Sequence, residues 1–138
     1  MLAARPAIRS AFITLHGTLG AGKTSFARHL LRALGVDGPI KSPTYTMVEE
    51  YRLQAADGDG PTTAWHFDFY RFDDPHEWED AGFRDIFAQR GLKLAEWPEK
   101  AAGLLPPDDL SITLVPGDDD ARHVTIEAHS ALGQELLR

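Results

Sequence analysis

Hydrophobic and polar positions divide the first quarter of the chain into a strand, a glycine-rich loop and a helix. Residues 11–15 form a short apolar run of the kind that builds a buried strand. After the loop, apolar residues recur at helical spacing up to Leu34, and Gly35 stands where a glycine commonly ends a helix. Residues 1–10 are expected to be a loose lead into a single domain over residues 11–138.

The rest of the chain predicts strands and helices that follow one another. Residues 44–54 and 64–70 read as strands of an antiparallel hairpin, with a turn at residues 57–61. A helix is predicted to start at Asp74 and Pro75 and to run toward Gln89, with Gly82 as a point where it can break, and Gly91 ends it. The remaining segments are strands at 92–96, 110–115 and 123–128, a short helix or turn at 98–105, and a weakly helical tail from residue 130. This pattern predicts an α/β sandwich with a mixed β-sheet.

Composition narrows the possible chemistry. The chain has 138 residues, a formal net charge of −7 and no cysteine, which excludes disulfides, zinc–thiolate sites and a cysteine nucleophile. An acidic chain without a Lys/Arg cluster is a poor candidate for binding nucleic acid alone, although it can serve an RNA pathway through a protein partner. Without a membrane-length apolar segment or a signal peptide, a cytoplasmic protein is expected.

The loop between the first strand and the first helix carries the clearest chemical signal. Residues 17–24 read Gly-Thr-Leu-Gly-Ala-Gly-Lys-Thr and fit the phosphate-binding motif G-x-x-x-x-G-K-[ST] at every fixed position. Glycines let successive N–H groups point at one anion, Lys23 supplies a positive charge for the phosphates, and Thr24 offers a hydroxyl to Mg²⁺. The predicted nucleotide-binding residues of this loop are Gly17, Leu19, Gly20, Ala21, Gly22, Lys23 and Thr24.

ATP is favoured over GTP as the nucleotide. GTP-specific switch proteins usually recognise guanine through an Asn-Lys-x-Asp motif, and the chain contains no asparagine.

Two acidic residues at strand ends are candidates for the reaction itself. Asp68 lies near the end of the strand at 64–70, where it could hold Mg²⁺ through water or orient the attacking water; the alternative is a local pair with Arg71. Glu96 ends the strand at 92–96, which is the layout of the second acidic motif of phosphate-loop proteins, and it could bind Mg²⁺ or activate water. His66 shares a strand face with Asp68 and is interpreted as a structural histidine.

Two further segments have weaker signals. Residues 42–46, Ser-Pro-Thr-Tyr-Thr, follow the first helix as the first switch of GTPases does, so the hydroxyls of Ser42 and Thr44 could sense the γ-phosphate. The same residues could equally form a plain turn into a strand. Trp97 follows Glu96 and is either a packing residue or part of the site.

Taken together, these segments resemble the TsaE family, the bacterial ATPases of tRNA threonylcarbamoyladenosine (t⁶A) biosynthesis. The resemblance rests on residues 17–26, on Lys-Ser-Pro-Thr-Tyr-Thr at 41–46, on His-Phe-Asp-Phe-Tyr-Arg at 66–71 and on Glu-Trp-Pro-Glu at 96–99. It implies a small ATPase that acts with TsaB and TsaD to modify adenosine 37 of tRNAs reading ANN codons, while TsaD performs the transfer. It also implies that Thr24 and Glu96 bind Mg²⁺, and that Asp68 and Trp97 matter for ATP binding or hydrolysis.

Two departures from the family pattern accompany this resemblance. Thr18 stands where the family loop usually has an acid, and the strand and helix that usually precede the loop and help hold adenine have little room in residues 1–10. Arg122 is the nearest candidate for a family arginine that approaches the nucleotide. A small-molecule kinase and a nucleotide-dependent adaptor with vestigial hydrolysis remain as alternative functions; a phosphorylated product would mark the kinase, and ATP turnover stimulated by partners would exclude the adaptor.

Overall fold

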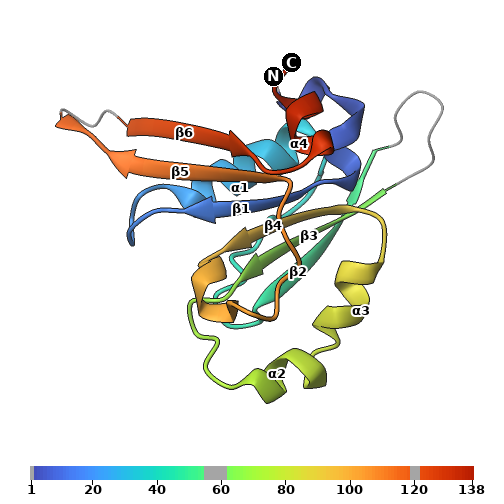
Figure 1. Ribbon diagram of the computed structural model, residues 1–138. Helices are drawn as coiled ribbons and strands as arrows, with labels where there is room; N and C mark the ends of the chain where they lie inside the picture. Colours follow the sequence, from blue (N-terminus) through green and yellow to red (C-terminus); the bar gives the residue numbers. More distant parts are fainter. Residues whose placement is uncertain (1, 55–61, 119–121) are drawn as a thin grey trace.

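The protein is built on one six-stranded sheet, seen in the computed structural model, which describes residues 2–54, 62–118 and 122–138 (Figure 1). The strand order is β2-β3-β4-β1-β5-β6. The strands are β1 (Phe12–His16), β2 (Val48–Leu53), β3 (Thr62–Asp68), β4 (Leu92–Glu96), β5 (Leu110–Pro116) and β6 (Arg122–Ala128). The helices are η1 (Leu2–Ala4), η2 (Pro6–Ser10), α1 (Lys23–Ala33), α2 (Pro75–Asp80), α3 (Phe83–Ala88), η3 (Pro98–Ala101) and α4 (Ala131–Leu136), of which those marked η are 3₁₀ turns.

Parallel and antiparallel pairings both occur, so the predicted single α/β domain with a mixed sheet is confirmed. β1 pairs in parallel with β4 and β5, and β4 pairs in parallel with β3. The two edge strands are antiparallel to their neighbours, and β2 with β3 forms the predicted hairpin. Because parallel strands end at the same side of a sheet, the loop after β1 and the last residues of β3 and β4 come together.

Two hydrophobic cores cover the two faces of the sheet, because successive residues of a strand point to opposite sides. Ile13 and Leu15 of β1 pack with Leu30 and Leu31 of α1 in the first core. Phe12 belongs instead to the second core, which is rich in aromatic rings. That second core contains Trp65, Phe67, Phe69, Phe72, Trp78 and Phe83. Trp65, Phe67 and Phe69 stand at alternate positions of the chain and therefore form one aromatic face toward this core.

The helical segment after β3 begins and breaks where its sequence predicts. The side chain of Asp74 caps α2 by accepting a hydrogen bond of 2.9 Å from the backbone N–H of His76. Gly82 has φ 70° and separates α2 from α3, a left-handed conformation that glycine adopts at little cost. None of the helices in the described part of the chain has the length and hydropathy needed to cross a bilayer.

Three expectations differ from the structure or fall outside it. The strand predicted from residue 44 starts only at Val48, because residues 44–46 form a turn in which Met47 N–H bonds to Pro43 O and Met47 has φ 65°. The segment expected to be a loose lead forms η1 and η2, and Ile8 is fully buried in the core beneath the sheet. The turn predicted at residues 57–61 lies outside the described residues.

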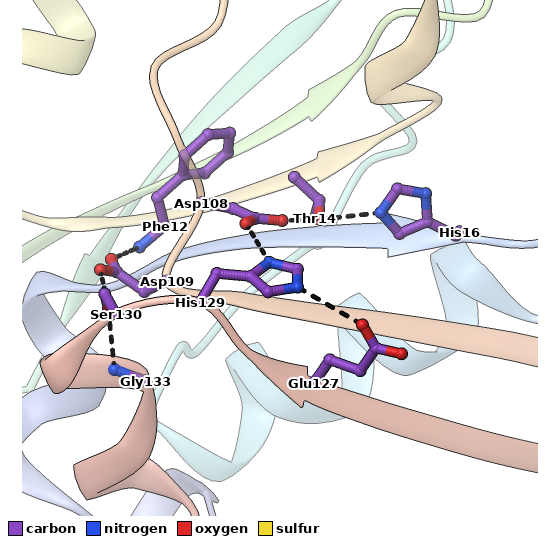
Figure 2. A network of polar contacts seen from close by, with 9 residues as sticks. All are labelled: Phe12, Thr14, His16, Asp108, Asp109, Glu127, His129, Ser130 and Gly133. Carbon is purple, nitrogen blue, oxygen red and sulfur yellow. Dashed lines mark hydrogen bonds and ion pairs between the residues drawn. The ribbon is translucent and has the colours of Figure 1, made fainter.

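A polar network fastens the end of the chain to the central strand (Figure 2). Asp109 accepts hydrogen bonds from Phe12 N–H at 2.8 Å and from Ser130 Oγ at 2.6 Å, and Ser130 caps α4 through Gly133 N–H. Asp108 bridges Thr14 Oγ1 at 2.5 Å and His129 Nδ1 at 2.6 Å. These contacts hold β6 and α4 in place against β1.

Candidate nucleotide and metal site

A cleft of about 380 Å³ opens where β1, β3 and β4 end. The sheet register places Asp68 beside Glu96, and Glu96 beside Leu15, which lies two residues before the glycine loop. The cleft is lined by Leu19, Gly20, Gly22, Lys23, Thr24, Ser25, Thr44, Asp68, Tyr70, Arg71, Glu96, Trp97 and Arg122. Most residues singled out in the sequence therefore meet in one place, although they come from five separate segments.

The glycines of the loop are required by close contacts. Gly17 has φ 147°, and a Cβ atom there would lie 2.6 Å from the backbone oxygen of Leu114. Gly22 has φ 105° and initiates α1, and a Cβ atom there would lie 3.2 Å from Nε of Arg122. The loop can thus run tightly between β5 and the start of α1, where helix N–H groups favour an anion.

Lys23 lies inside the loop rather than in solvent. Its side chain is 4% exposed, its Nζ donates to Gly17 O at 2.6 Å, and the same Nζ lies 3.3 Å from the ring centroid of Trp97. Burial lowers the pKa of Lys23, and the nearby carboxylates of Glu96, Glu99 and Asp68 oppose that shift. A phosphate entering the cleft would offer this ammonium a stronger partner than a carbonyl oxygen and an aromatic face.

Thr24 and Glu96 form the contact most relevant to a metal ion. Thr24 Oγ1 donates to the carboxylate of Glu96, with distances of 2.8 Å to Oε1 and 3.0 Å to Oε2. A hydroxyl and a carboxylate oxygen are hard ligands that suit Mg²⁺, which usually takes one or two protein oxygens and completes its shell with phosphate and water. Among the described residues no group of three His, Cys, Asp or Glu side chains could hold a metal by itself. The residues present therefore fit Mg²⁺ held jointly with a nucleotide.

His66 is buried beside the carboxylate of Glu96. Its Nε2 donates to Glu96 Oε2 at 2.6 Å, and the two side chains are only 1% and 2% exposed. His66 and Asp68 share one face of β3, as the alternation predicts, and that face meets the end of β4. A buried histidine with a buried hydrogen-bond partner fits the interpretation of His66 as a structural residue. The sequence did not predict that this partner is Glu96, because the contact depends on the register of β3 with β4.

Asp68 lies beside this pair. Its Oδ1 accepts the Tyr70 N–H at 2.9 Å, while the guanidinium of Arg71 lies over the ring of Tyr45 at 4.6 Å. The local Asp68–Arg71 pair considered from the sequence is thus replaced by a backbone contact. Burial raises the pKa of Asp68, and the nearby charge of Glu96 raises it further. The hydrogen bond from the Tyr70 N–H and the positions of His66 and Lys23 lower the same pKa by a smaller amount. A carboxylate with a raised pKa is a better acceptor for a water proton.

The remaining predicted residues lie at the rim of the cleft. Trp97 adopts a left-handed backbone with φ 55°, and its ring contacts that of Tyr70 at 5.0 Å. Thr44 lines the cleft, whereas Ser42 lies just outside it and shares a hydrogen bond of 2.8 Å with Thr44 Oγ1.

Arg122 reaches the loop from β6. Its Nε donates to Ala21 O at 3.0 Å, so its guanidinium lies against the loop backbone. The contact crosses 101 positions of sequence and links the far edge of the sheet to the phosphate loop.

Comparison with known proteins shows the family of the chain. A family model described as "Threonylcarbamoyl adenosine biosynthesis protein TsaE" matches residues 2–124. Proteins named tRNA threonylcarbamoyladenosine biosynthesis protein TsaE are similar to this chain. The Haemophilus influenzae protein is 40% identical over 94% of this chain and 77% of its own length, and the Bacillus subtilis protein is 36% identical over 91% and 77%.

A solved structure has a similar fold. The crystal structure of Bacillus subtilis YdiB superposes with a TM-score of 0.73 and 30% identity, covering 99% of this chain and 80% of that one. Since the family model spans nearly the whole chain and the relatives are similar along most of their length, the chain belongs to the TsaE family.

Proposed function

We propose that this protein is a Mg²⁺-dependent ATP hydrolase that works with TsaB and TsaD in the t⁶A37 modification of tRNAs reading ANN codons. The observation that carries the proposal is the contact of Thr24 with Glu96 beside the buried Lys23, at the mouth of a glycine loop. Membership of the TsaE family supports the tRNA pathway, because the relatives are named for threonylcarbamoyladenosine biosynthesis.

The residues of the cleft have distinct roles in this proposal. The loop N–H groups and Lys23 bind the phosphates, with Lys23 leaving Gly17 O as the nucleotide enters. Thr24 and Glu96 hold Mg²⁺, which when bound neutralises charge on the phosphate oxygens. Asp68 either orients the attacking water or contacts the metal through a water.

Hydrolysis by the chain alone is expected to be slow. The two arginines at the cleft have other contacts, since Arg71 lies over Tyr45 and Arg122 bonds to Ala21 O. Neither is held as an arginine finger, a group worth about 10³–10⁵ in rate. Exposed apolar side chains at the rim support a role for partner proteins, since Leu19 is 73% and Tyr45 81% exposed. Partners that cover this rim could exclude water and complete the site.

The direct test is ATP turnover with and without purified TsaB and TsaD, in the parent protein and two variants. Lys23→Ala should weaken ATP binding at least about tenfold, because each charge-assisted phosphate contact contributes about 1.5–3 kcal/mol. Glu96→Gln should keep the shape of the site and lower hydrolysis on the order of 100-fold, with a much smaller effect on nucleotide binding.

Glu79→Gln is the matched control, because it makes the same chemical change at an exposed position of α2. Parental turnover in Glu96→Gln would contradict the assigned role of Glu96. Nucleotide-dependent partner binding without any partner-stimulated turnover would favour the adaptor, and a phosphorylated small molecule would favour the kinase.

A further inference from the structure

The edge strand β6 is open on both of its faces. All residues from Arg122 to Glu127 are exposed, and among the strands that the structure describes β6 pairs only with β5 (Figure 1). The apolar side chains of Val124 and Ile126 are 51% and 37% exposed. Natural edge strands are usually protected by proline, charged side chains (lysine above all), a bulge or a covering element. The segment 122–128 contains neither proline nor lysine, its charged residues Arg122 and Glu127 lie toward its two ends, and its register with β5 runs without a bulge.

The register with β5 fixes which backbone groups of β6 are free. His129 N–H donates to Asp109 O, so the pair Asp109–His129 exchanges ladder hydrogen bonds. In an antiparallel ladder such pairs alternate, and Pro116, which has no N–H, then falls in a non-bonded pair opposite Arg122. The N–H and C=O groups that point away from the sheet therefore belong to Arg122, Val124, Ile126 and Ala128.

The sequence of this strand is complementary to itself. If a second β6 ran antiparallel with Thr125 opposite Thr125, Val124 would face Ile126 and His123 would face Glu127, each twice. The four residues whose backbone groups point away from the sheet would then exchange hydrogen bonds between the two strands, Val124 with Ile126 and Arg122 with Ala128. If the two-fold centre moves to residue 124 or 126, one of the four residues whose backbone groups point away from the sheet loses its partner in each strand. If the centre falls between two residues, backbone groups that point outward on one strand face groups that point inward on the other.

We propose that this edge is the dimer interface of the protein: two copies pair their β6 strands antiparallel about Thr125 and form one continuous sheet. The cross-strand pairs of the β-branched residues Val124 and Ile126 favour this register, and so do the cross-strand pairs of His123 with Glu127. The dimer goes beyond the proposed ATPase function. It would also lie close to the nucleotide, because Arg122 at the start of β6 bonds to Ala21 in the phosphate loop.

The first test is sedimentation of the whole chain over a range of concentration. A strand-to-strand interface is small, below the ~1,200 Å² of a standard complex, so weak association is expected and the range should extend to about 1 mM. The mass should rise from the monomer value of 15.2 kDa toward twice that value. Val124→Pro should abolish association, because it removes an outward N–H without breaking the β5 ladder. Val124→Thr, which keeps the shape and the N–H, should still associate.

A charge exchange tests the register itself. His123→Glu places like charges opposite Glu127 at two points and should weaken association at least about tenfold, and the double variant His123→Glu/Glu127→Lys should restore it. A chain that stays monomeric at about 1 mM overturns the proposal, as does association that Val124→Pro or His123→Glu leaves unchanged. Unfolding curves for each variant separate loss of association from loss of the fold. Because none of these measurements uses ATP turnover, failure here is distinct from failure of the proposed function.

Discussion

At the scale of single residues, Glu96 is the centre of the polar contacts in the cleft. Its carboxylate accepts hydrogen bonds from Thr24 on one side and from His66 on the other, with almost no exposure to solvent. A buried carboxylate is stable only when it is well partnered, so each partner affects both its orientation and the stability of the fold.

The contribution of His66 can be measured by comparing two substitutions. His66→Phe removes the donor to Glu96, and loss of a residue that orients a metal ligand typically lowers metal affinity about 10- to 100-fold. The Mg²⁺-dependent part of nucleotide affinity should fall by that factor, while affinity in EDTA should change little. Calorimetric titration of ADP with Mg²⁺ and with EDTA provides the measurement.

His66→Gln is the matched variant, because an amide can still donate to the carboxylate. It should recover most of the Mg²⁺ dependence. A loss of Mg²⁺ dependence of equal size in both variants would indicate that His66 only fills space.

At the scale of elements, the phosphate loop depends on its neighbour β5. Gly17→Ala should destabilise the nucleotide-free protein by about 3 kcal/mol or more, since the new methyl group would clash with Leu114 O in a backbone already at positive φ. Gly20→Ala, at φ 82° but with nothing within 4 Å of its Cβ position, should cost only about 1–2 kcal/mol of strain. Urea unfolding of the two variants measures this difference in stability. Equal losses of stability would show that the positive φ, and not the clash with Leu114 O, determines the cost.

The junction of β6 with α4 should respond to pH through His129. The hydrogen bond to Asp108 raises the pKa of His129 above its ordinary value of 6.5, and the charge of Asp108 and the contact with Glu127 add to the shift. Because the folded pKa is the higher one, this stabilisation is fully present below pH 6.5 and is lost as the pH rises through the folded pKa. His129→Gln removes it, so the stability difference between parent and variant should shrink as the pH rises. A difference that is constant across this pH range would contradict the prediction.

Several elements were predictable because their signals are local. The glycine spacing of the loop, the Asp-Pro start of α2 and the break at Gly82 each depend on a few adjacent residues. Long-range contacts were not predictable in this way. The His66–Glu96 contact depends on the register of β3 with β4, and the Thr14–Asp108 contact joins residues 94 positions apart.

At the scale of the whole molecule, nucleotide state and partner binding should be linked. The turn at residues 44–46 and the side chain of Tyr70 lie at the cleft, so a bound nucleotide can change the surface that a TsaB–TsaD pair meets. ATP, and not ADP, should tighten partner binding, and the partners should tighten ATP binding by the same factor. Partner affinity measured with a non-hydrolysable ATP analogue, with ADP and without nucleotide tests this. Equal affinity under all three conditions would leave the cleft as a passive ATP site.

The position of Trp97 has an optical consequence. Of the three tryptophans, Trp65 and Trp78 lie in the aromatic core at 4% and 6% exposure, whereas the ring of Trp97 lies against the ammonium of Lys23 in the cleft. When a phosphate draws that charge away from the indole, the emission of Trp97 should change while the two core rings supply a constant background. The intrinsic fluorescence of the unlabelled protein would then report in real time the step at which Lys23 leaves the ring of Trp97 and binds the phosphate.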